Sequence, residues 1–304
     1  MDLLAAFRTY VRVAESGSFS AVAREMGATQ PAVSRQVSAL EEHLGARLIQ
    51  RTTRSLTLTE EGRVLLDHAR RVLDCVEEAE AAVGRGHPSV SGLVRIATPA
   101  SFGRLHVAPL IGRLLDRHPE LLVELQMSDT TADLIAGGID LAIRAGQVAD
   151  AGLVARRIGS SPRQVFASRD YLARSGMPQH PADLGAHACI IFLQLATPHD
   201  WSFDGPDGEV SVHVEGRFRT DSSEAVREAV LGGLGLSLSP SWMFGDDVAT
   251  GRVEAVLGGY RAGQVPIHAV YPTRRHLAPR TRAVIDFFAD EFRLDPAISS
   301  YGAA

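Results

Sequence analysis

The sequence predicts a multidomain fold, with an all-α N-terminal region followed by a larger α/β region. Three observations predict this class. Short amphipathic segments separated by glycines fill the first 44 residues, and a heptad-like repeat covers 59–84. Strand-like apolar runs then alternate with helical ones from residue 93 onward. A run rich in Gly and Pro at 85–92 separates the two patterns and is typical of a hinge linker.

The composition excludes several classes of protein. All 31 basic residues are arginines, so a P-loop, a pyridoxal phosphate Schiff base and a protein kinase, which each need a lysine, are excluded. Two cysteines, Cys75 and Cys189, are too few for a disulfide framework or a Cys-based zinc site. No G-x-S-x-G, H-E-x-x-H or complete dinucleotide-binding glycine motif occurs. We therefore expect no enzymatic activity, no metal and no cofactor.

The beginning of the chain does not have the pattern of a signal peptide. Asp2 follows the first Met, and Arg8 and Arg12 interrupt the apolar stretch. No apolar run in the chain approaches the roughly 18 residues of a membrane span. We therefore expect a soluble, cytoplasmic protein with no membrane partner.

The first 44 residues predict three short helices. Apolar residues recur every three or four positions along the first helix, which Gly17 ends. Ser18 and Thr29 stand where they can cap the second and third helices, and Pro31 fits the first turn of the third. The buried face of the third helix is predicted to carry Val33, Val37, Leu40 and Leu44.

Two short helices joined by a glycine turn make a helix-turn-helix. The residues on the exposed face of the third helix then indicate whether this motif binds DNA. That face carries Gln30, Ser34, Arg35 and Ser38. Gln pairs with adenine and Arg with guanine in the major groove, while Ser adapts to either. The alternative interpretation is a small helical subdomain with a solvated polar face.

The segment that follows predicts a β-wing. Apolar residues alternate in it, and Arg47, Arg51 and Arg54 lie within eight positions, where they can hold phosphates or enter a minor groove. The charge is also segregated. Residues 1–58 hold seven arginines against five acidic residues (+2), whereas 59–304 hold 24 against 31 (−7). This excess favours DNA binding by the N-terminal region, although the whole chain has a net charge of −5.

From Leu3 to Gly62 the sequence resembles the N-terminal domain of LysR-type transcriptional regulators. The run TQPAVSRQVSALEEHLGARLIQR is similar to the signature of that family, with Thr29 where Ser is more usual and Ile49-Gln50 where Phe and a variable residue are frequent. The resemblance implies a winged helix-turn-helix at 1–58 that binds double-stranded operator DNA. The residues that we expect to contact DNA are Ser18, Ser20, Thr29, Gln30, Pro31, Ser34, Arg35, Ser38, Arg51, Thr52, Thr53 and Arg54.

The stretch 59–84 predicts one long helix, with Thr59 as its cap and Glu60 and Glu61 in its first turn. Its seam follows heptad spacing and consists of Leu65, Ala69, Val72, Val76, Ala79 and Val83. Nothing nearby in sequence is expected to cover both this seam and Leu66 and Leu73, so a partner chain would do so. The alternative is an amphipathic helix packed on its own domain. The resemblance also implies a linker helix through which two subunits pair.

The region 93–304 predicts two α/β lobes. Strands LVRIA, LLVELQM and IDLAIRA with intervening helices make a βαβαβ unit with parallel strands. A second set follows, with strands RQVFAS, CIIFL, EVSVHVEGRF and LGLSLS, and the chain ends on PIHAVYP and a long helix. SFGRLHVAPL, DLAIRAG, LVARRIG and HAVYPTRRHLAPRTRAVIDFF are similar to one large LysR-type subgroup. The resemblance implies a type II periplasmic-binding-protein-like arrangement, with lobe I at 93–162 and 267–295, lobe II at 163–266, and crossing strands near Pro162 and Pro266.

Ligands of open α/β sheets bind beyond the carboxyl ends of the strands, at helix N-termini. Hydroxyls and free N–H groups at two opposed helix starts, with an arginine nearby, suit a small carboxylate; an aromatic molecule is the other candidate. Each hydroxyl alone is more often a cap, and the phenylalanines can be plain core. The candidate effector-binding residues are Thr98, Ala100, Ser101, Phe102, Asp129, Thr130, Arg144, Phe192, Thr220, Asp221 and Ser222.

These patterns together predict a sequence-specific transcriptional regulator whose DNA binding is modulated by a small molecule between the two lobes. The resemblance implies a homotetramer built as a dimer of dimers, with RNA polymerase as a further candidate partner. A nonspecific or ligand-independent DNA-binding protein is one alternative. The other is a periplasmic-type binding protein, which would need a signal peptide and no helix-turn-helix.

Overall fold

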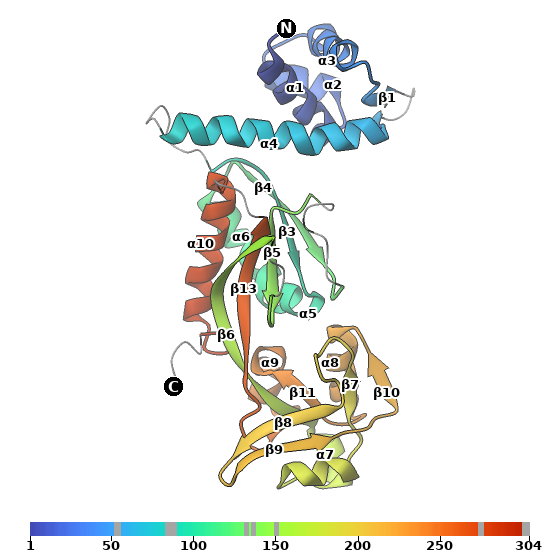
Figure 1. The fold of residues 1–304 in the computed structure, drawn as a ribbon, viewed down its shortest axis with the longest axis vertical. Helices are drawn as coiled ribbons and strands as arrows, with labels where there is room; N and C mark the ends of the chain where they lie inside the picture. Colours follow the sequence, from blue (N-terminus) through green and yellow to red (C-terminus); the bar gives the residue numbers. More distant parts are fainter. Residues whose placement is uncertain are drawn as a thin grey trace. The chain divides into compact units, whose positions relative to one another are not determined.

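The computed structural model divides the chain into two compact units, one formed by residues 1–89 with 276–279 and the other by residues 90–275 with 280–304, and each is described by itself (Figure 1). The structure describes residues 1–51, 56–82, 90–130, 134, 138–148, 152–272 and 277–299. No helix within these ranges is long and apolar enough to span a membrane.

The N-terminal unit is a helix-turn-helix with a two-stranded wing and one long helix. Its elements are α1 (Leu3–Ser16), α2 (Phe19–Glu25), α3 (Gln30–Leu44), β1 (Ile49–Arg51), β2 (Leu56–Leu58) and α4 (Glu60–Ala82). Gly17 ends α1 in the left-handed conformation that glycine adopts freely, with φ of 63°. Ser18 caps α2 by accepting the Ala21 N–H. Thr29 stands at the N-cap of α3, but the expectation that its hydroxyl caps the helix is wrong, because its side chain makes no capping hydrogen bond.

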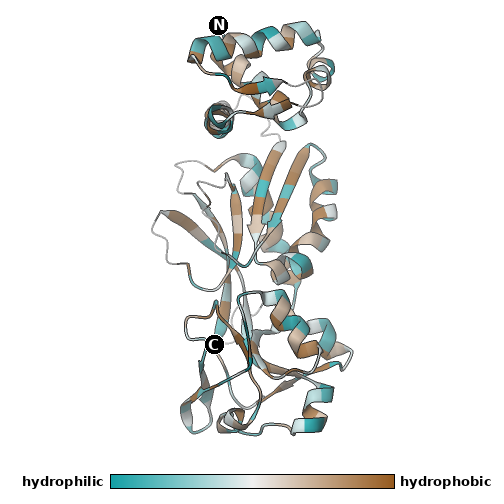
Figure 2. Cartoon of the chain, turned by 90° about the vertical axis from the view of Figure 1, so that its right-hand side faces the viewer, coloured by the Kyte–Doolittle hydropathy of each residue, from teal (hydrophilic) through white to brown (hydrophobic). Residues whose placement is uncertain are grey.

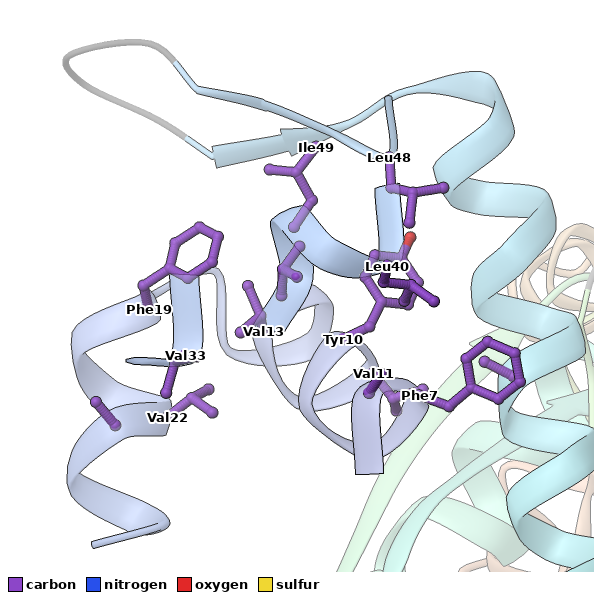
Figure 3. Close-up of a cluster of buried hydrophobic side chains, with 14 of the residues drawn as sticks. Phe7, Tyr10, Val11, Val13, Phe19, Val22, Val33, Leu40, Leu48 and Ile49 are labelled. Atoms are coloured by element: carbon purple, nitrogen blue, oxygen red, sulfur yellow. The ribbon is translucent and has the colours of Figure 1, made fainter. Parts of the chain in front are cut away.

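The three short helices enclose one apolar core (Figure 3). Tyr10 lies at its centre, fully buried, and its hydroxyl donates to Gly62 O at 2.6 Å, which joins α1 to α4. Burial raises the pKa of the Tyr10 phenol, so the ring stays neutral. Val33, Val37 and Leu40 face the core as predicted. The prediction for Leu44 is wrong: it is 42% exposed, because α3 ends there, at the edge of the core.

The long helix α4 starts on a cap and continues the core. Thr59 Oγ1 accepts the Gly62 N–H at 2.9 Å, so the predicted cap is confirmed. Ala69 and Leu73 are buried in the core of their own unit, and Arg70 donates to Glu15 of α1 at 2.8 Å. The expectation that only a partner chain could cover Leu73 is therefore wrong.

The C-terminal unit is built on a sheet of seven strands (Figure 1). The strands lie in the order β11-β6-β13-β5-β3-β4, and β12 also pairs with β6. Their bounds are β3 (Gly92–Thr98), β4 (Leu121–Met127), β5 (Leu141–Ala145), β6 (Leu153–Ser168), β11 (Ser237–Pro240), β12 (Val253–Val256) and β13 (Gln264–Pro272). Strand β3 pairs in parallel with both β4 and β5, as the βαβαβ pattern predicted. Hydrophobic residues alternate with hydrophilic ones along the strands of this unit (Figure 2).

The two longest strands, β6 and β13, run antiparallel and serve both halves of the unit. Gln264 lies opposite Pro162 and Pro266 opposite Ser160, so the strands pair at the place where the sequence predicted crossovers. On one side of this point the sheet extends through β5, β3 and β4. The helices of this half are α5 (Ala100–Phe102), η1 (Gly103–Val107), η2 (Ala108–Leu110), α6 (Ile111–Arg117) and α10 (Pro279–Leu294). We call this half lobe I, and the rest of the unit lobe II.

Lobe II has its own buried core. Its other elements are α7 (Arg169–Ser175), η3 (Pro181–Ala186), β7 (Ile190–Phe192), β8 (Asp200–Gly205), β9 (Gly208–His213), β10 (Phe218–Thr220), α8 (Ser223–Leu231), η4 (Ser241–Met243) and α9 (Gly245–Ala249). The prediction of one strand over EVSVHVEGRF is wrong: β9 pairs with β8 in a hairpin, whereas β10 pairs in parallel with β7. Gly216 allows this break, because a Cβ there would meet Cys189 O at 1.7 Å.

Candidate nucleic-acid interface and interlobe site

The outer face of α3 presents the side chains that the sequence predicted. Gln30, Arg35 and Ser38 are exposed, and Ser34 is half-buried between them. The opposite face of the helix is held in the core by Val33 and its neighbours, so these polar groups have a fixed direction. The Arg35 guanidinium has no hydrogen bond or ion pair with any residue that the structure describes. The helix thus presents side chains of the kind that a recognition helix uses to contact bases.

The other predicted DNA contacts surround α3. Ser20 and Pro31 are exposed, and Ser18 caps α2. Strands β1 and β2 form an antiparallel hairpin in which Arg51 lies opposite Leu56. Thr52, Thr53 and Arg54 lie outside the described residues.

Sequence reasoning missed Glu41, which connects the recognition helix to the wing. Glu41 Oε1 accepts the backbone N–H of Leu48 at 2.8 Å and of Ile49 at 3.1 Å. The carboxylate thus fixes the start of β1 against α3. No periodic pattern could have found it, because the bond joins a helix to a loop that folds back on it.

In the C-terminal unit the first turns of α5 and α8 meet. Helix α5 follows β3 in lobe I and α8 follows β10 in lobe II, as the positions at the strand ends predicted. The Ser101 N–H donates to Ser223 Oγ at 3.2 Å. Arg104, on the same helical run as α5, donates twice to Glu224 of α8, at 2.8 and 3.0 Å. The two lobes are therefore in direct contact at the predicted site.

Asp129 of lobe I lies at the centre of this contact. Its Oδ2 accepts the Ser223 N–H at 2.6 Å, and its Oδ1 accepts the Ala100 N–H at 3.1 Å. Ser223 Oγ is 2.8 Å from Oδ2 and 2.9 Å from Oδ1. The position that the sequence assigned to the carboxylate of a ligand is thus held by a carboxylate of the chain itself.

The other predicted effector contacts in these turns cap helices, are buried at a strand end or are exposed. Ser222 caps α8 by accepting the Ala225 N–H, and Thr220 Oγ1 accepts the Ser222 N–H. Thr98 is buried at the end of β3, whereas Thr130 and Asp221 are exposed.

Phe102 belongs to an aromatic cluster, as the alternative interpretation of the sequence had it. Its ring is fully buried and packs edge-on against Trp242, with ring centroids 5.1 Å apart, and against Phe292, at 5.4 Å. Arg144 lies on β5 opposite His268, and Phe192 ends β7, where it is half-buried.

Sequence reasoning also missed the residues that join the lobes: Ser223, Arg104 and Glu224. Ser223 stands one residue after the predicted cap, and the first turn of a helix carries hydroxyls too often for the pattern to separate a cap from a contact. The Arg104–Glu224 pair spans 120 positions in sequence, so no local spacing reveals it.

Comparison with known proteins is consistent with this architecture. A family model described as the bacterial regulatory helix-turn-helix protein, lysR family, matches residues 4–63, and one described as the LysR substrate binding domain matches 87–293. An HTH-type transcriptional regulator of Xanthomonas campestris pv. campestris is 37% identical, over 94% of this chain and 84% of its own length. PtxR, an HTH-type transcriptional regulator of Pseudomonas aeruginosa, is 34% identical, over 94% and 92%. The solved structure of CrgA, a LysR-type transcriptional regulator from Neisseria meningitidis, is 32% identical with a TM-score of 0.62, over 94% and 97%.

The fold and the two sites define a helix-turn-helix protein that carries a two-lobed α/β ligand-binding domain. With two family models matching nearly the whole chain, it belongs to the LysR family of bacterial transcriptional regulators. Regulators of this family bind DNA through the helix-turn-helix and small-molecule effectors through the substrate-binding domain.

The Arg104–Glu224 pair predicts a pH-dependent contribution to stability. The Arg104 guanidinium lowers the pKa of the Glu224 carboxyl below its ordinary value of 4.5. The stabilisation is therefore complete above about pH 5 and is lost as the pH falls through the lowered pKa. Both side chains are partly exposed, so we expect Arg104→Met to cost no more than about 1 kcal/mol of unfolding free energy near neutral pH.

Denaturant unfolding of both proteins between pH 3 and pH 8 measures this effect. The gap between wild type and Arg104→Met should close below pH 4.5, the ordinary pKa. In a Glu224→Gln background the same substitution should show no such pH dependence. A gap that stays constant down to pH 3 would show that the pair does not stabilise the folded state through the charge of Glu224.

Proposed function

We propose that this LysR-type regulator reads operator sequence with Gln30, Ser34 and Arg35 of α3. The observation that carries this proposal is the exposed guanidinium of Arg35, which has no partner in the described part of the chain, on a helix whose other face is fixed in the core. A guanidinium forks onto guanine O6 and N7, and the Gln amide onto adenine N6 and N7. Ser38 is exposed farther along the same helix.

We propose that the wing and the turn before α3 position the protein on the DNA backbone. Hydroxyls and arginines at Ser18, Ser20, Thr29, Arg51, Thr52, Thr53 and Arg54 suit phosphate contacts. Glu41 supports this role, because it bonds the start of the wing to α3. The residues proposed to contact phosphates therefore keep a fixed position relative to those proposed to contact bases.

We propose that α4 pairs two subunits. Two residues of the predicted seam, Leu65 and Ala69, pack in the core of their own unit. Val72, Val76 and Ala79 remain for a partner, and Val83 lies outside the described residues. Val72 is 40% exposed. A second copy of the helix would remove this apolar surface from water. From its membership of the family we also propose that the protein assembles into a tetramer, lies in the cytoplasm and contacts RNA polymerase.

We propose that a small-molecule effector acts between the lobes. Because α5 and α8 meet there, a molecule bound between them changes how the lobes close and so changes the geometry of the DNA-binding units. The effector must bind two closure states with unequal affinity, since equal affinity shifts no equilibrium.

Replacement of Arg35 tests the readout of bases. We expect Arg35→Ala to lower affinity for the operator by about 1–3 kcal/mol, or roughly 5- to 150-fold, with a much smaller loss on random DNA at the same salt concentration. Fluorescence anisotropy with both DNAs measures the two affinities. Arg8→Ala is the control, because Arg8 is also exposed but lies on α1. Equal losses on both DNAs would make Arg35 a phosphate contact and would contradict the proposal.

Replacement of Val72 tests the dimer. We expect Val72→Arg to weaken self-association by at least tenfold, because a charge would then be buried between the two helices. Sedimentation velocity over a range of protein concentrations measures this. Val248→Arg is the matched control, because Val248 of lobe II is 41% exposed. The same oligomeric state for Val72→Arg and wild type would exclude this face of α4 as the interface.

A further inference from the structure

The loop after β4 places one carboxylate against the first turns of two helices in different lobes. The carboxylate of Asp129 accepts hydrogen bonds from the N–H of Ala100 in α5 and from the N–H and hydroxyl of Ser223 in α8, at 2.6–3.1 Å. These two N–H groups have no partner inside their own helices, since the first turn of a helix leaves its donors free. Asp129 thus satisfies them with a group from the chain itself.

Backbone amides and a hydroxyl at a helix start are the donors that a bound anion would use. A carboxylate of the chain has a large advantage over one in solution, because its tether keeps it at a high effective concentration. A free carboxylate ligand must therefore displace Asp129 before it can use the same donors.

The charge of the interlobe contact also disfavours an anion. Arg104 is the cation that reaches across it, and both of its bonds go to Glu224, so these two charges cancel. Asp129 makes no ion pair with any arginine within the described part of the chain, which leaves one uncompensated negative charge. A second anion there would be repelled.

One polar group at the contact is left for a ligand. Ser101 is fully buried, and among the residues that the structure describes its Oγ makes at most a weak contact, to the Glu224 carboxylate, whose pKa it helps to lower. Its backbone N–H donates to Ser223 Oγ, so the hydroxyl lies beside the Asp129 contact. An unpaired buried hydroxyl is costly, and a ligand hydrogen bond would remove that cost.

We propose that Asp129 determines the specificity of the effector site, because its carboxylate takes the position that the carboxylate of a ligand would occupy. The effector is then an uncharged or cationic molecule with hydrogen-bond donors, not a carboxylate. This inference rests on the proposed effector function of the lobes. Donors on such a molecule can bond the Asp129 carboxylate and the Ser101 hydroxyl, whereas a carboxylate finds its donors already taken.

Small carboxylates test the proposal directly, because removing the Asp129 side chain should open the anion position to them. We expect formate and acetate to leave the melting temperature of the full-length wild-type protein unchanged relative to chloride at equal ionic strength. Asp129→Ala should show a saturable rise of about 3–6 °C at ten times the dissociation constant of the anion. Formamide and acetamide, the neutral counterparts, should not reproduce this rise in the variant.

Asp183→Ala is the matched control, because the Asp183 carboxylate also accepts two backbone N–H groups, of Gln179 and His180, but within lobe II. It should show no such rise. If Asp129→Ala does not fold, Asp129→Ser shortens the side chain, keeps a polar group and allows the same titration.

Three results would overturn the proposal. One is a saturable response of the wild-type protein to formate or acetate, which would show that Asp129 does not exclude anions. The second is no response of the Asp129 variant, and the third is an equal response of Asp183→Ala. The DNA experiments with Arg35 involve no carboxylate, so failure of the regulator function and failure of this inference are separate outcomes.

Discussion

The two antiparallel strands β6 and β13 are the constraint on which the C-terminal unit depends. Strand β6 pairs with β13 over residues 153–162 and with β11 and β12 over 163–168, so one strand belongs to both lobes. The lobes therefore cannot separate without breaking the hydrogen-bonded ladders of this strand. This shared strand brings the start of α5 in lobe I to the start of α8 in lobe II, although they lie more than 100 positions apart in sequence.

Once the helix starts face one another, their free N–H groups need acceptors. Asp129 accepts from Ala100 and Ser223, and Ser223 Oγ accepts from Ser101. Together with the Arg104–Glu224 pair, these bonds make the lobe contact polar and directional. A contact of this kind is made or lost as a unit, because each bond depends on the same approach of the lobes. It is therefore suited to a sensor that has two states of closure.

The N-terminal unit depends on a comparable constraint. Tyr10 bonds α1 to the start of α4, Arg70 ties α4 to Glu15, and Glu41 ties α3 to the wing. None of these groups is among the predicted DNA contacts. They hold it still, so that Arg35 and Gln30 keep a defined direction when they meet a groove.

The sequence predicted the helices, the wing, the parallel βαβαβ unit and the crossing strands, because each has a local period, a glycine or a cap residue. It did not predict β8, although exposed and buried residues alternate along that strand, or the break between β9 and β10, which depends on the close approach of Gly216 to Cys189. It placed Asp129 at the effector site, but it did not predict that the carboxylate accepts the helix-start N–H groups itself. Those donors come from Ala100 and Ser223, which only the folded chain brings next to Asp129.

Hydrogen exchange at three backbone amides tests the central claim most directly. In an isolated helix the N–H groups of Ala100, Ser101 and Ser223 would exchange rapidly, since they belong to first turns. In the ligand-free protein we expect them to exchange slowly, because Asp129 accepts from Ala100 and Ser223, and Ser223 accepts from Ser101. Exchange at the rate of an unstructured peptide, while the rest of β3 and α8 stays protected, would contradict the claim that an internal carboxylate joins the two lobes.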